Sequence, residues 1–536
     1  MHTETSSGDL ASGRMQNWPL TLDRLIDQAA RWHGDTEVVS RLPSGAMVRS
    51  DYATLRAKAR RISAFLLAAG VTPGDRIATL AFNSHDHLAS WYGIMGIGAV
   101  CHTLNPRLPP EQLRYIVNHA GDRMLFADAC FALLARDLST GCPTIERMVL
   151  INGERDGESL DSLIDRIDES AVHWGGFAET ATAGLCYTSG TTGDPKGVGY
   201  THRSNYLHAL ITMSPDAFAI SSRDVVMPVV PMFHANSWGL AYSAPASGAK
   251  LVLPGSMLDG ESLHLLIEQE GVTFSAGVPT VWQGYVDYLR DQGISSTALE
   301  RVVIGGSACP PSLMADLEAL GATVIHAWGM TELSPVGLVA TPTREVDRLA
   351  PSERRRLLEK QGRPIGIDAR VVDDDGVELA RDGASPGRLE VRGPAVVERY
   401  AGAGESALND AGWFDTGDIA TIDPAGFVEI TDRAKDIIKS GGEWISSVMI
   451  ENAALTHPNV ALAAVIAIDH PKWGERPKLY VQLRFPDPAP PSTYRDHLEG
   501  RIAKWWLPDE VEVIDAIPLG STGKIDKKAL RARLKS

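Results

Sequence analysis

Short apolar runs recur along the chain, and each ends in a loop rich in Gly, Ser, Pro or His. Segments with helical spacing lie between them, and the first of these, 22–29, stops before Gly34. This alternation predicts parallel sheets with helices on both faces, and ligands bind beyond the carboxyl ends of the strands in such sheets. We expect strands at 76–82, 185–187, 225–230, 251–253, 302–304 and 323–327, and a helix at 86–97.

The pattern changes towards the C-terminus. Short β runs separated by turns such as 373–376 and 423–426 predict an antiparallel, barrel-like subdomain over 369–430. Beyond a boundary near Asp432, we expect a helix at 448–455 and a hydrophobic strand at 461–468. Because a single core stops growing at roughly 250–300 residues, a chain of 536 residues is expected to form at least two structural units.

Composition excludes several classes of protein. No apolar run approaches the roughly 18 residues that a membrane span needs, and residues 1–14 lack the apolar region of a signal peptide, so we expect a disordered lead and a cytoplasmic protein. A formal charge of −16 argues against a nucleic-acid partner. The five cysteines form no C-x-x-C pair, so we expect reduced thiols, with neither a zinc site nor a disulfide framework.

One string, YTSGTTGDPKGV at 187–198, carries the donors that a triphosphate needs. Its glycines allow backbone N–H groups to turn inward and form an anion-binding nest. The lysine has no Ser or Thr after it, so the string is not the usual P-loop. A polar hairpin is the alternative interpretation. The donors are the hydroxyls of Thr188, Ser189, Thr191 and Thr192, the backbone at Gly190, Gly193 and Gly197, and the ammonium of Lys196.

Further strings follow in a fixed order: PMFHANSWG, GGSA, WGMTE, WFDTGD, DRAKD, KSGGEW and GSTGKI. Together with the phosphate loop they resemble the motifs of the adenylate-forming enzymes, the superfamily of acyl-CoA synthetases, peptide-synthetase adenylation domains and luciferases. The resemblance implies an α/β fold with a large N-terminal domain of two parallel-rich sheets, a small β-barrel-like subdomain, and a small, mobile α+β C-terminal domain. It implies an AMP-binding domain at 15–431, a hinge at 432–436 and a C-terminal lid domain at 437–536.

The resemblance also implies roles in handling ATP. Lys524 is expected to bridge the substrate carboxylate and the α-phosphate, and Glu332 to hold Mg²⁺, for which one carboxylate and the substrate phosphates suffice. Catalytic roles are expected for Lys524, Thr188, His234 and Glu332. Expected ATP or AMP contacts are Thr188, Ser189, Gly190, Thr191, Thr192, Gly193, Lys196, Gly306, Ser307, Ala308, Trp328, Gly329, Met330, Thr331, Asp418, Arg433 and Lys524.

His234 opens a segment similar to the family's gate beside the acyl pocket, although a histidine in a loop is more often a surface or core residue. Trp238, one helical turn further on, is large enough to close the pocket, which favours a short or medium acyl chain. The expected pocket comprises His234, Trp238, Val278, Gly306, Trp328 and Gly329.

The motifs after Asp418 imply a moving C-terminal domain. Arg433 is expected to contact the ribose with Asp418, whereas Asp415 supports the turn. Lys435 matches the family's hinge position, the alternative being a solvated surface lysine. The expected CoA-binding residues are Lys439, Gly441, Gly442, Glu443 and Trp444.

The predicted activity is that of an ATP-dependent, AMP-forming acyl-CoA ligase that uses Mg²⁺. Within the superfamily the chain most resembles medium-chain acyl-CoA synthetases and methylmercaptopropionate-CoA ligases, through HTLNPRL at 102–108, PMFHANSWG and SGGEWIS. A medium-chain fatty acid, 3-(methylthio)propionate and an arylalkanoate are the open candidates. Alternatives are a stand-alone enzyme that loads a carrier protein, a luciferase-like oxygenase and a non-catalytic nucleotide-binding protein. Homodimers are common among the relatives, so a homodimer is a candidate state.

Overall fold

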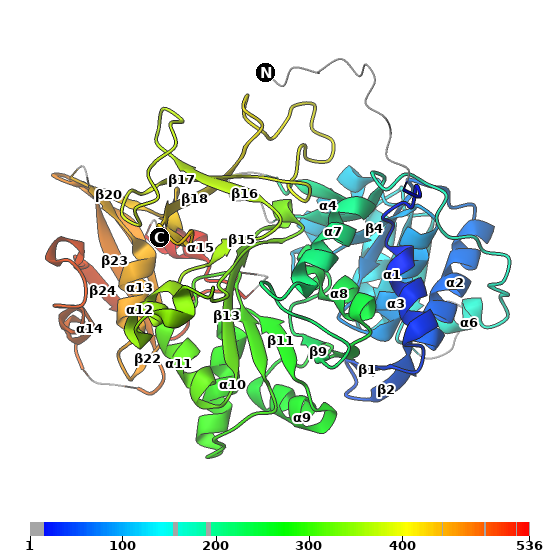
Figure 1. The fold of residues 1–536 in the computed structure, drawn as a ribbon, viewed down its shortest axis with the longest axis horizontal. Helices are drawn as coiled ribbons and strands as arrows, with labels where there is room; N and C mark the ends of the chain where they lie inside the picture. Colours follow the sequence, from blue (N-terminus) through cyan, green and yellow to red (C-terminus); the bar gives the residue numbers. More distant parts are fainter. Residues whose placement is uncertain are drawn as a thin grey trace.

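The computed structural model describes residues 15–153, 159–188, 194–441, 443–486, 489–520 and 523–534. A six-stranded sheet, ordered β6-β5-β3-β4-β7-β8, forms the first layer of the fold (Figure 1). Its strands are parallel except for the antiparallel pair β7–β8, which flanks the predicted phosphate loop. The strands are β3 (Arg76–Leu80), β4 (Val100–Thr103), β5 (Met124–Asp128), β6 (Arg147–Ile151), β7 (Thr182–Tyr187) and β8 (Gly197–Thr201).

A second, nine-stranded sheet lies beside the first and has the order β15-β14-β13-β12-β11-β9-β10-β1-β2. Its central strands, from β13 to β1, are parallel, and its edges are antiparallel. The strands are β1 (Glu37–Arg41), β2 (Met47–Asp51), β9 (Val225–Pro228), β10 (Lys250–Leu253), β11 (Phe274–Gly277), β12 (Arg301–Ile304), β13 (Thr323–Gly329), β14 (Val336–Val339) and β15 (Arg363–Pro364). All the strands predicted from apolar runs are present.

Helices cover these two sheets, and several begin at side-chain caps: Asp51 accepts from Thr54 N at the start of α2, and Ser84 from His87 N at the start of α3. Gly93 lets α3 pack closely on α2, because a Cβ there would lie 2.7 Å from the Ala59 carbonyl oxygen. The helices are α1 (Asp23–Trp32), α2 (Tyr52–Ala68), α3 (His85–Gly96), α4 (Pro110–Ala120), α5 (Ala132–Gly141), α6 (Leu160–Ile164), α7 (His202–Met213), α8 (Leu240–Ser247), α9 (Gly260–Glu270), α10 (Pro279–Asp291), α11 (Pro311–Ala319) and α12 (Pro351–Leu358).

The predicted β-rich subdomain is a four-stranded antiparallel sheet, β16-β17-β18-β19. Its strands are β16 (Asp368–Val372), β17 (Gly387–Arg392), β18 (Phe414–Ile422) and β19 (Val428–Arg433). The β18–β19 register places Asp418 directly opposite Arg433. Two residues of separate sequence motifs are therefore fixed as cross-strand neighbours by the sheet itself.

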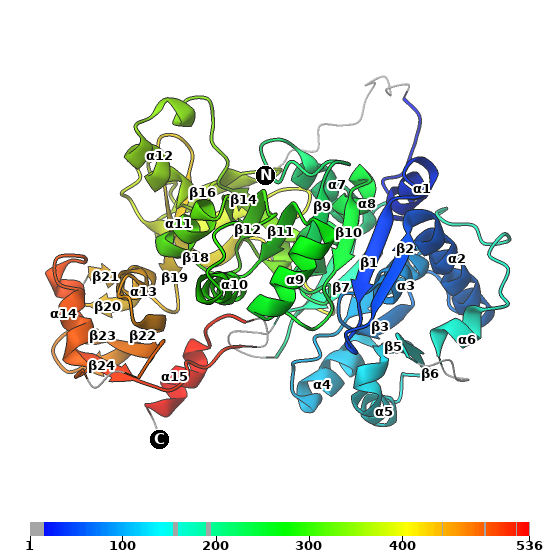
Figure 2. The same ribbon diagram turned by 90° about the horizontal axis from the view of Figure 1, so that it is seen from below.

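The C-terminal domain is a five-stranded sheet with three helices, at one end of the molecule (Figures 1 and 2). The predicted helix and strand beyond Asp432 are α13 and β22. The elements are β20 (Ile438–Ser440), β21 (Glu443–Ile445), α13 (Ser447–Leu455), β22 (Val460–His470), β23 (Gly474–Leu483), α14 (Ser492–His497), β24 (Glu510–Val513) and α15 (Lys527–Arg533).

Two negative findings apply to the described part of the chain. None of its helices is both long and apolar enough to cross a membrane. The cysteines there are free thiols, four of them buried and Cys130 exposed, and no group of His, Cys, Asp and Glu side chains is arranged to hold a metal ion.

Candidate active site

The segment that carries Lys524 leaves the C-terminal domain and docks on loops of the N-terminal domain. A short turn holds it, in which Gly520 N donates to the Lys524 carbonyl at 2.7 Å. The Thr280 hydroxyl, at the start of α10, donates to the Gly523 carbonyl at 3.2 Å. A Cβ on Gly306 would lie 3.3 Å from Lys524 Cε. The C-terminal domain therefore delivers this lysine to the ends of β11 and β12.

Two of the predicted acyl-pocket residues, Val278 and Trp238, lie against Gly306. A Cβ on this glycine would lie 3.2 Å from Val278 Cγ1 and 3.6 Å from Trp238 Cζ2. Trp238 is only 6% exposed, and its indole also lies 3.3 Å from the position of a Cβ on Gly305. The indole of Trp238 therefore packs against both glycines.

Trp238 lies in a turn whose left-handed backbone conformation was not predicted from the sequence. Residues 235–238 all have positive φ, between 44° and 54°, so the helical turn expected between His234 and Trp238 is left-handed. Such backbone costs roughly 1–2 kcal/mol per residue outside glycine. Two side-chain bonds hold the turn: Ser237 Oγ donates to the Val230 carbonyl at 2.8 Å, and Asn236 Nδ2 to Asn205 Oδ1 at 3.4 Å. Tertiary contacts, not local propensity, therefore set the direction of Trp238.

Asp418 is the central residue of the part of the site predicted to bind the nucleoside. Arg433 Nε lies 2.7 Å from Asp418 Oδ1, and Trp328 Nε1 donates to Oδ2 at 2.9 Å. The Asp418 side chain is 2% exposed and that of Arg433 41% exposed. Burial raises the pKa of Asp418, although Arg433 opposes this effect. The predicted residues Trp328, Asp418 and Arg433 thus form one hydrogen-bonded cluster.

A cavity of about 520 Å³ is lined by the predicted residue Ala308 and by Ile430 and Thr431 of β19, among others. His326, which the sequence did not single out, also lines it and is 1% exposed. Its Nδ1 lies 2.8 Å from the Glu359 carbonyl oxygen, whereas its Nε2 has no hydrogen-bond partner among the described residues. Burial lowers the pKa of His326 to about 4, so the ring is neutral. Nδ1 therefore donates, and Nε2 is a buried acceptor left for a ligand.

The phosphate side is described only at its edges, because Ser189, Gly190, Thr191, Thr192 and Gly193 lie outside the described residues. Thr188 N donates to the Lys196 carbonyl at 2.9 Å, which closes the base of the loop. Glu332 is 7% exposed and accepts a hydrogen bond from Tyr400 Oη at 2.9 Å. The ring of Tyr400 also lies 4.9 Å from Lys196 Nζ. Burial raises the pKa of Glu332.

The other predicted nucleotide contacts continue the same loops. Thr331 is buried, and its carbonyl accepts from Tyr200 Oη at 2.9 Å. Gly329 packs on backbone, since a Cβ there would lie 2.1 Å from the Pro335 carbonyl oxygen. Met330 is half-buried, and Ser307 is exposed.

Charged side chains of both signs lie near Lys524, with Arg433 opposed by Asp418 and Glu332. Burial, with the charge of Arg433, lowers the pKa of Lys524 to about 8. Burial, with the charges of Lys524 and Arg107, lowers the pKa of His234 to about 3, so this histidine is neutral at physiological pH. The guanidinium of Arg107 lies 5.9 Å from the ring centroid of Phe233.

The predicted CoA-binding residues are not at the site. Lys439, Gly441, Glu443 and Trp444 are exposed on β20 and β21, an edge hairpin of the C-terminal sheet that lies away from α15 (Figure 2). Gly441 N donates to the Trp473 carbonyl at 2.8 Å. Gly442 lies outside the described residues.

The hinge residue predicted from sequence, Lys435, lies just after β19, and burial lowers its pKa. Its neighbour Asp436 pairs with Arg531 of α15 at 2.5 Å. On the N-terminal side, Asp432 Oδ2 accepts from Ser447 N of α13 at 2.6 Å. The segment therefore has polar contacts to the C-terminal domain on both sides of Lys435.

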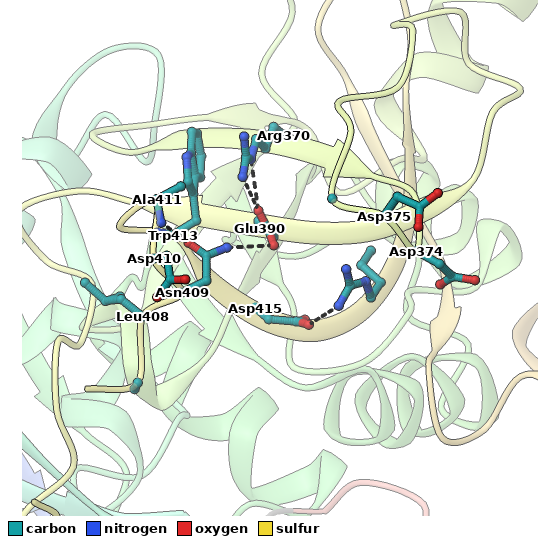
Figure 3. A pocket seen from close by; sticks show the side chains of 13 residues that line it. Arg370, Asp374, Asp375, Glu390, Leu408, Asn409, Asp410, Ala411, Trp413 and Asp415 are labelled. Carbon is teal, nitrogen blue, oxygen red and sulfur yellow. Dashed lines mark hydrogen bonds and ion pairs between the residues drawn. The ribbon is translucent and has the colours of Figure 1, made fainter. Parts of the chain in front are cut away.

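Asp415 faces a different part of the surface. Its Oδ1 accepts from Gly417 N at 2.8 Å, and its Oδ2 lies 3.4 Å from Arg388 Nη1, at the edge of a surface cavity of about 580 Å³ (Figure 3). Arg370 and Glu390 also line this cavity and form an ion pair at 2.7 Å (Figure 3). The carboxylate of Asp415 thus supports the turn that leads to Asp418.

Sequence reasoning missed His326 and Tyr400. His326 stands only two residues before Trp328, so the strand that carries the WGMTE string was the available signal. Tyr400 lies in the segment between β17 and β18, far along the chain from Glu332, and no local pattern indicates their contact.

Two family models match the chain. Residues 25–401 match the AMP-binding enzyme family, and residues 449–524 match the AMP-binding enzyme C-terminal domain. The chain is 47% identical over 535 residues to 3-methylmercaptopropionyl-CoA ligase of Ruegeria lacuscaerulensis, covering 98% of this chain and 99% of that protein. It is 44% identical over 532 residues to medium-chain-fatty-acid–CoA ligase of Ectopseudomonas oleovorans, covering 97% of each.

Solved structures share the fold. The crystal structure of the anthranilate CoA ligase AuaEII in complex with anthranoyl-AMP has a TM-score of 0.86 to this chain, at 24% identity, covering 97% of this chain and 99% of that one. ATP-bound MatB from Rhodopseudomonas palustris has a TM-score of 0.82, also at 24% identity, covering 97% and 99%. The α/β fold class predicted from the sequence is confirmed.

Proposed function

The chain belongs to the AMP-binding enzyme family and is an AMP-forming acyl-CoA ligase, and from that premise we propose that its acid is short and unbranched, with 3-(methylthio)propionate the first candidate. The observation that carries this choice is the position of Trp238, whose bulky indole packs against Gly305 and Gly306, beside the docked Lys524. A relative that acts on 3-methylmercaptopropionate supports it. A medium-chain fatty acid is the second candidate, supported by the Ectopseudomonas relative.

In the first half-reaction, a carboxylate oxygen of the acid attacks the α-phosphorus of ATP, and pyrophosphate leaves with the electrons of the broken P–O bond. Lys524 lies against Gly306, where it can contact both the carboxylate and the α-phosphate. Its ammonium stabilises the charge that builds up in the transition state. Neutral His234 adds no competing charge beside the acid.

The nucleoside of ATP occupies the cavity lined by Ala308 and Ile430. The Asp418 carboxylate accepts from the ribose hydroxyls, with Arg433 holding it in place. The adenine lies between the Ala308 loop and Ile430, where the unpartnered His326 Nε2 accepts from the exocyclic amino group. This assignment gives a partner to a buried polar atom that has none among the described residues.

Glu332 fits a magnesium ion. Its buried carboxylate accepts from Tyr400 but forms no ion pair with a lysine or arginine of the described residues, so its charge is left for a cation. When bound, Mg²⁺ neutralises the charge of the substrate phosphates. The phosphate loop and Lys196 supply the remaining contacts to the triphosphate.

In the second half-reaction, the thiol sulfur of CoA attacks the acyl carbon, and AMP leaves as the C–S bond forms. We place the AMP-binding domain at 15–431, the hinge at 432–436 and the lid at 437–536, and the lid rotates about Lys435 between the two steps. This rotation withdraws Lys524 and brings the hairpin of Lys439, Gly441, Gly442, Glu443 and Trp444 to the site. The exposure of that hairpin while Lys524 is docked supports the proposal.

The substrate assignment is tested by kcat/KM for CoA thioester formation across straight-chain acids from acetate to dodecanoate, 3-(methylthio)propionate and 3-phenylpropionate. We expect short acids and the thioether acid to be preferred. Trp238→Ala should shift the preference towards longer chains by at least about tenfold. Trp32→Ala, at a tryptophan that is 69% exposed, is the matched control and should keep the original profile. An optimum at dodecanoate, or an unchanged profile in Trp238→Ala, would contradict the assignment.

A further inference from the structure

Tyr400 connects two charged residues that come from different motifs. Its hydroxyl donates to Glu332 Oε1 at 2.9 Å, and its ring centroid lies 4.9 Å from Lys196 Nζ. One side chain therefore contacts both the carboxylate on the metal side and the lysine on the phosphate side.

The backbone around Tyr400 is fixed to the same two motifs. Val397 N donates to the Glu332 carbonyl at 2.7 Å, and Ala401 N donates to the Gly197 carbonyl at 2.8 Å. Gly197 follows Lys196 at the start of β8. The segment 397–401 therefore spans from the 3₁₀ turn that carries Glu332 to the first residue of β8, and Tyr400 lies between its two anchors.

The chemistry of each contact is directional. A phenol is protonated at physiological pH, so the Tyr400 hydroxyl donates its hydrogen bond to the Glu332 carboxylate. A donated hydrogen bond fixes the orientation of a ligating carboxylate and opposes the effect of burial on its pKa. An aromatic face attracts an ammonium without neutralising it, so Lys196 is held in place with its charge available to a phosphate.

We propose that Tyr400 is a positioning residue that orients Glu332 towards a divalent cation through its hydroxyl and holds Lys196 towards the phosphates through its ring. This inference rests on the proposed roles of Glu332 and Lys196. The two functions are separable, since Tyr400→Phe removes only the hydroxyl and Tyr400→Leu removes both the hydroxyl and the ring.

The test is the equilibrium affinity for ATP, measured by isothermal titration calorimetry without acid or CoA, once with excess Mg²⁺ and once with EDTA. The dissociation constant in EDTA divided by that with Mg²⁺ reports how much the metal contributes to ATP affinity. Tyr400→Phe should reduce this ratio by about tenfold or more, as loss of a partner of a metal ligand does, while the affinity in EDTA stays within about twofold. Tyr400→Leu should also weaken binding in EDTA by roughly two- to fivefold.

Tyr52→Phe is the matched control for the loss of a phenolic hydroxyl. Its hydroxyl donates to the Ala249 carbonyl at 2.6 Å, at a buried position remote from Glu332. This variant should keep the unmodified enzyme's ratio of ATP dissociation constants in EDTA and with Mg²⁺. Thermal unfolding of all three variants shows whether each is folded.

The outcomes separate the inference from its premise. If the unmodified enzyme binds ATP more tightly with Mg²⁺ and folded Tyr400→Phe keeps the full ratio, the role of Tyr400 is refuted and that of Glu332 stands. If the ATP affinity of the unmodified enzyme does not respond to Mg²⁺, the metal role of Glu332 is refuted and the inference fails with it. A ratio that is reduced in Tyr400→Phe but not in Tyr52→Phe supports the role of Tyr400 as well as that of Glu332.

Discussion

The low pKa of Lys524 makes the adenylation step sensitive to alkaline pH. The lysine acts as a cation, and burial lowers its pKa to about 8, so its charge is present below pH 8 and is lost as the pH rises through that value. The protonated fraction falls from about 90% at pH 7 to about 10% at pH 9. The kcat/KM for ATP, which reports ionisations of the free enzyme, should therefore fall by about tenfold over this range.

The assay is acid-dependent pyrophosphate release without CoA, at ATP concentrations below KM, from pH 6.5 to pH 9.5. His234 does not contribute to the profile, because its pKa of about 3 lies far below the range. Thioester formation from supplied acyl-AMP should instead increase with pH, since a thiol with a pKa of roughly 8.5 ionises over the same interval. Opposite slopes for the two half-reactions are expected.

Lys524→Arg provides the control, because a guanidinium stays protonated throughout. The variant should be slower at pH 7, and its alkaline decrease should disappear. A flat profile up to pH 9.5 in the unmodified enzyme, or the same decrease in Lys524→Arg, would refute the assignment of this ionisation to Lys524.

Two further substitutions test the ribose contact and the docking of the C-terminal domain. Asp418→Ala removes a buried carboxylate that Arg433 and Trp328 orient, and should raise KM for ATP by roughly tenfold or more; an unchanged KM in folded protein would contradict the ribose role. Arg484 lies 2.6 Å from Asp287 across the domain interface, with both side chains partly exposed, so Arg484→Asp should slow adenylation by about fivefold. The double variant Asp287→Arg/Arg484→Asp should recover most of that loss, and no recovery would mean that the pair does not hold the domain.

The fold was largely predictable because local sequence patterns indicate its strands and helices. Apolar runs such as 76–82 and 323–327 are strands, and the helix expected to stop before Gly34 ends at Trp32. These features depend on residues within one element or between consecutive elements.

The site was predictable only in part, because much of it comes from tertiary contacts. The resemblance to a family identified Asp418, but the left-handed turn that directs Trp238 is set by contacts to Val230 and Asn205, which no periodicity reveals. Tyr400 was missed for the same reason: its partner Glu332 lies 68 positions away in the sequence. Contacts between residues so far apart in the sequence depend on how the sheets pack. A short stretch of sequence does not reveal them.

The proposed two-step mechanism requires that Lys524 serve adenylation alone. The decisive measurement is the rate of each half-reaction in Lys524→Ala, with pyrophosphate release for the first step and conversion of supplied acyl-AMP and CoA to acyl-CoA for the second. We predict a loss of roughly 10²–10³-fold in adenylation, with thioester formation close to that of the unmodified enzyme. Equal losses in both half-reactions, or full adenylation without the lysine, would contradict a single site that uses Lys524 in one state and withdraws it in the other.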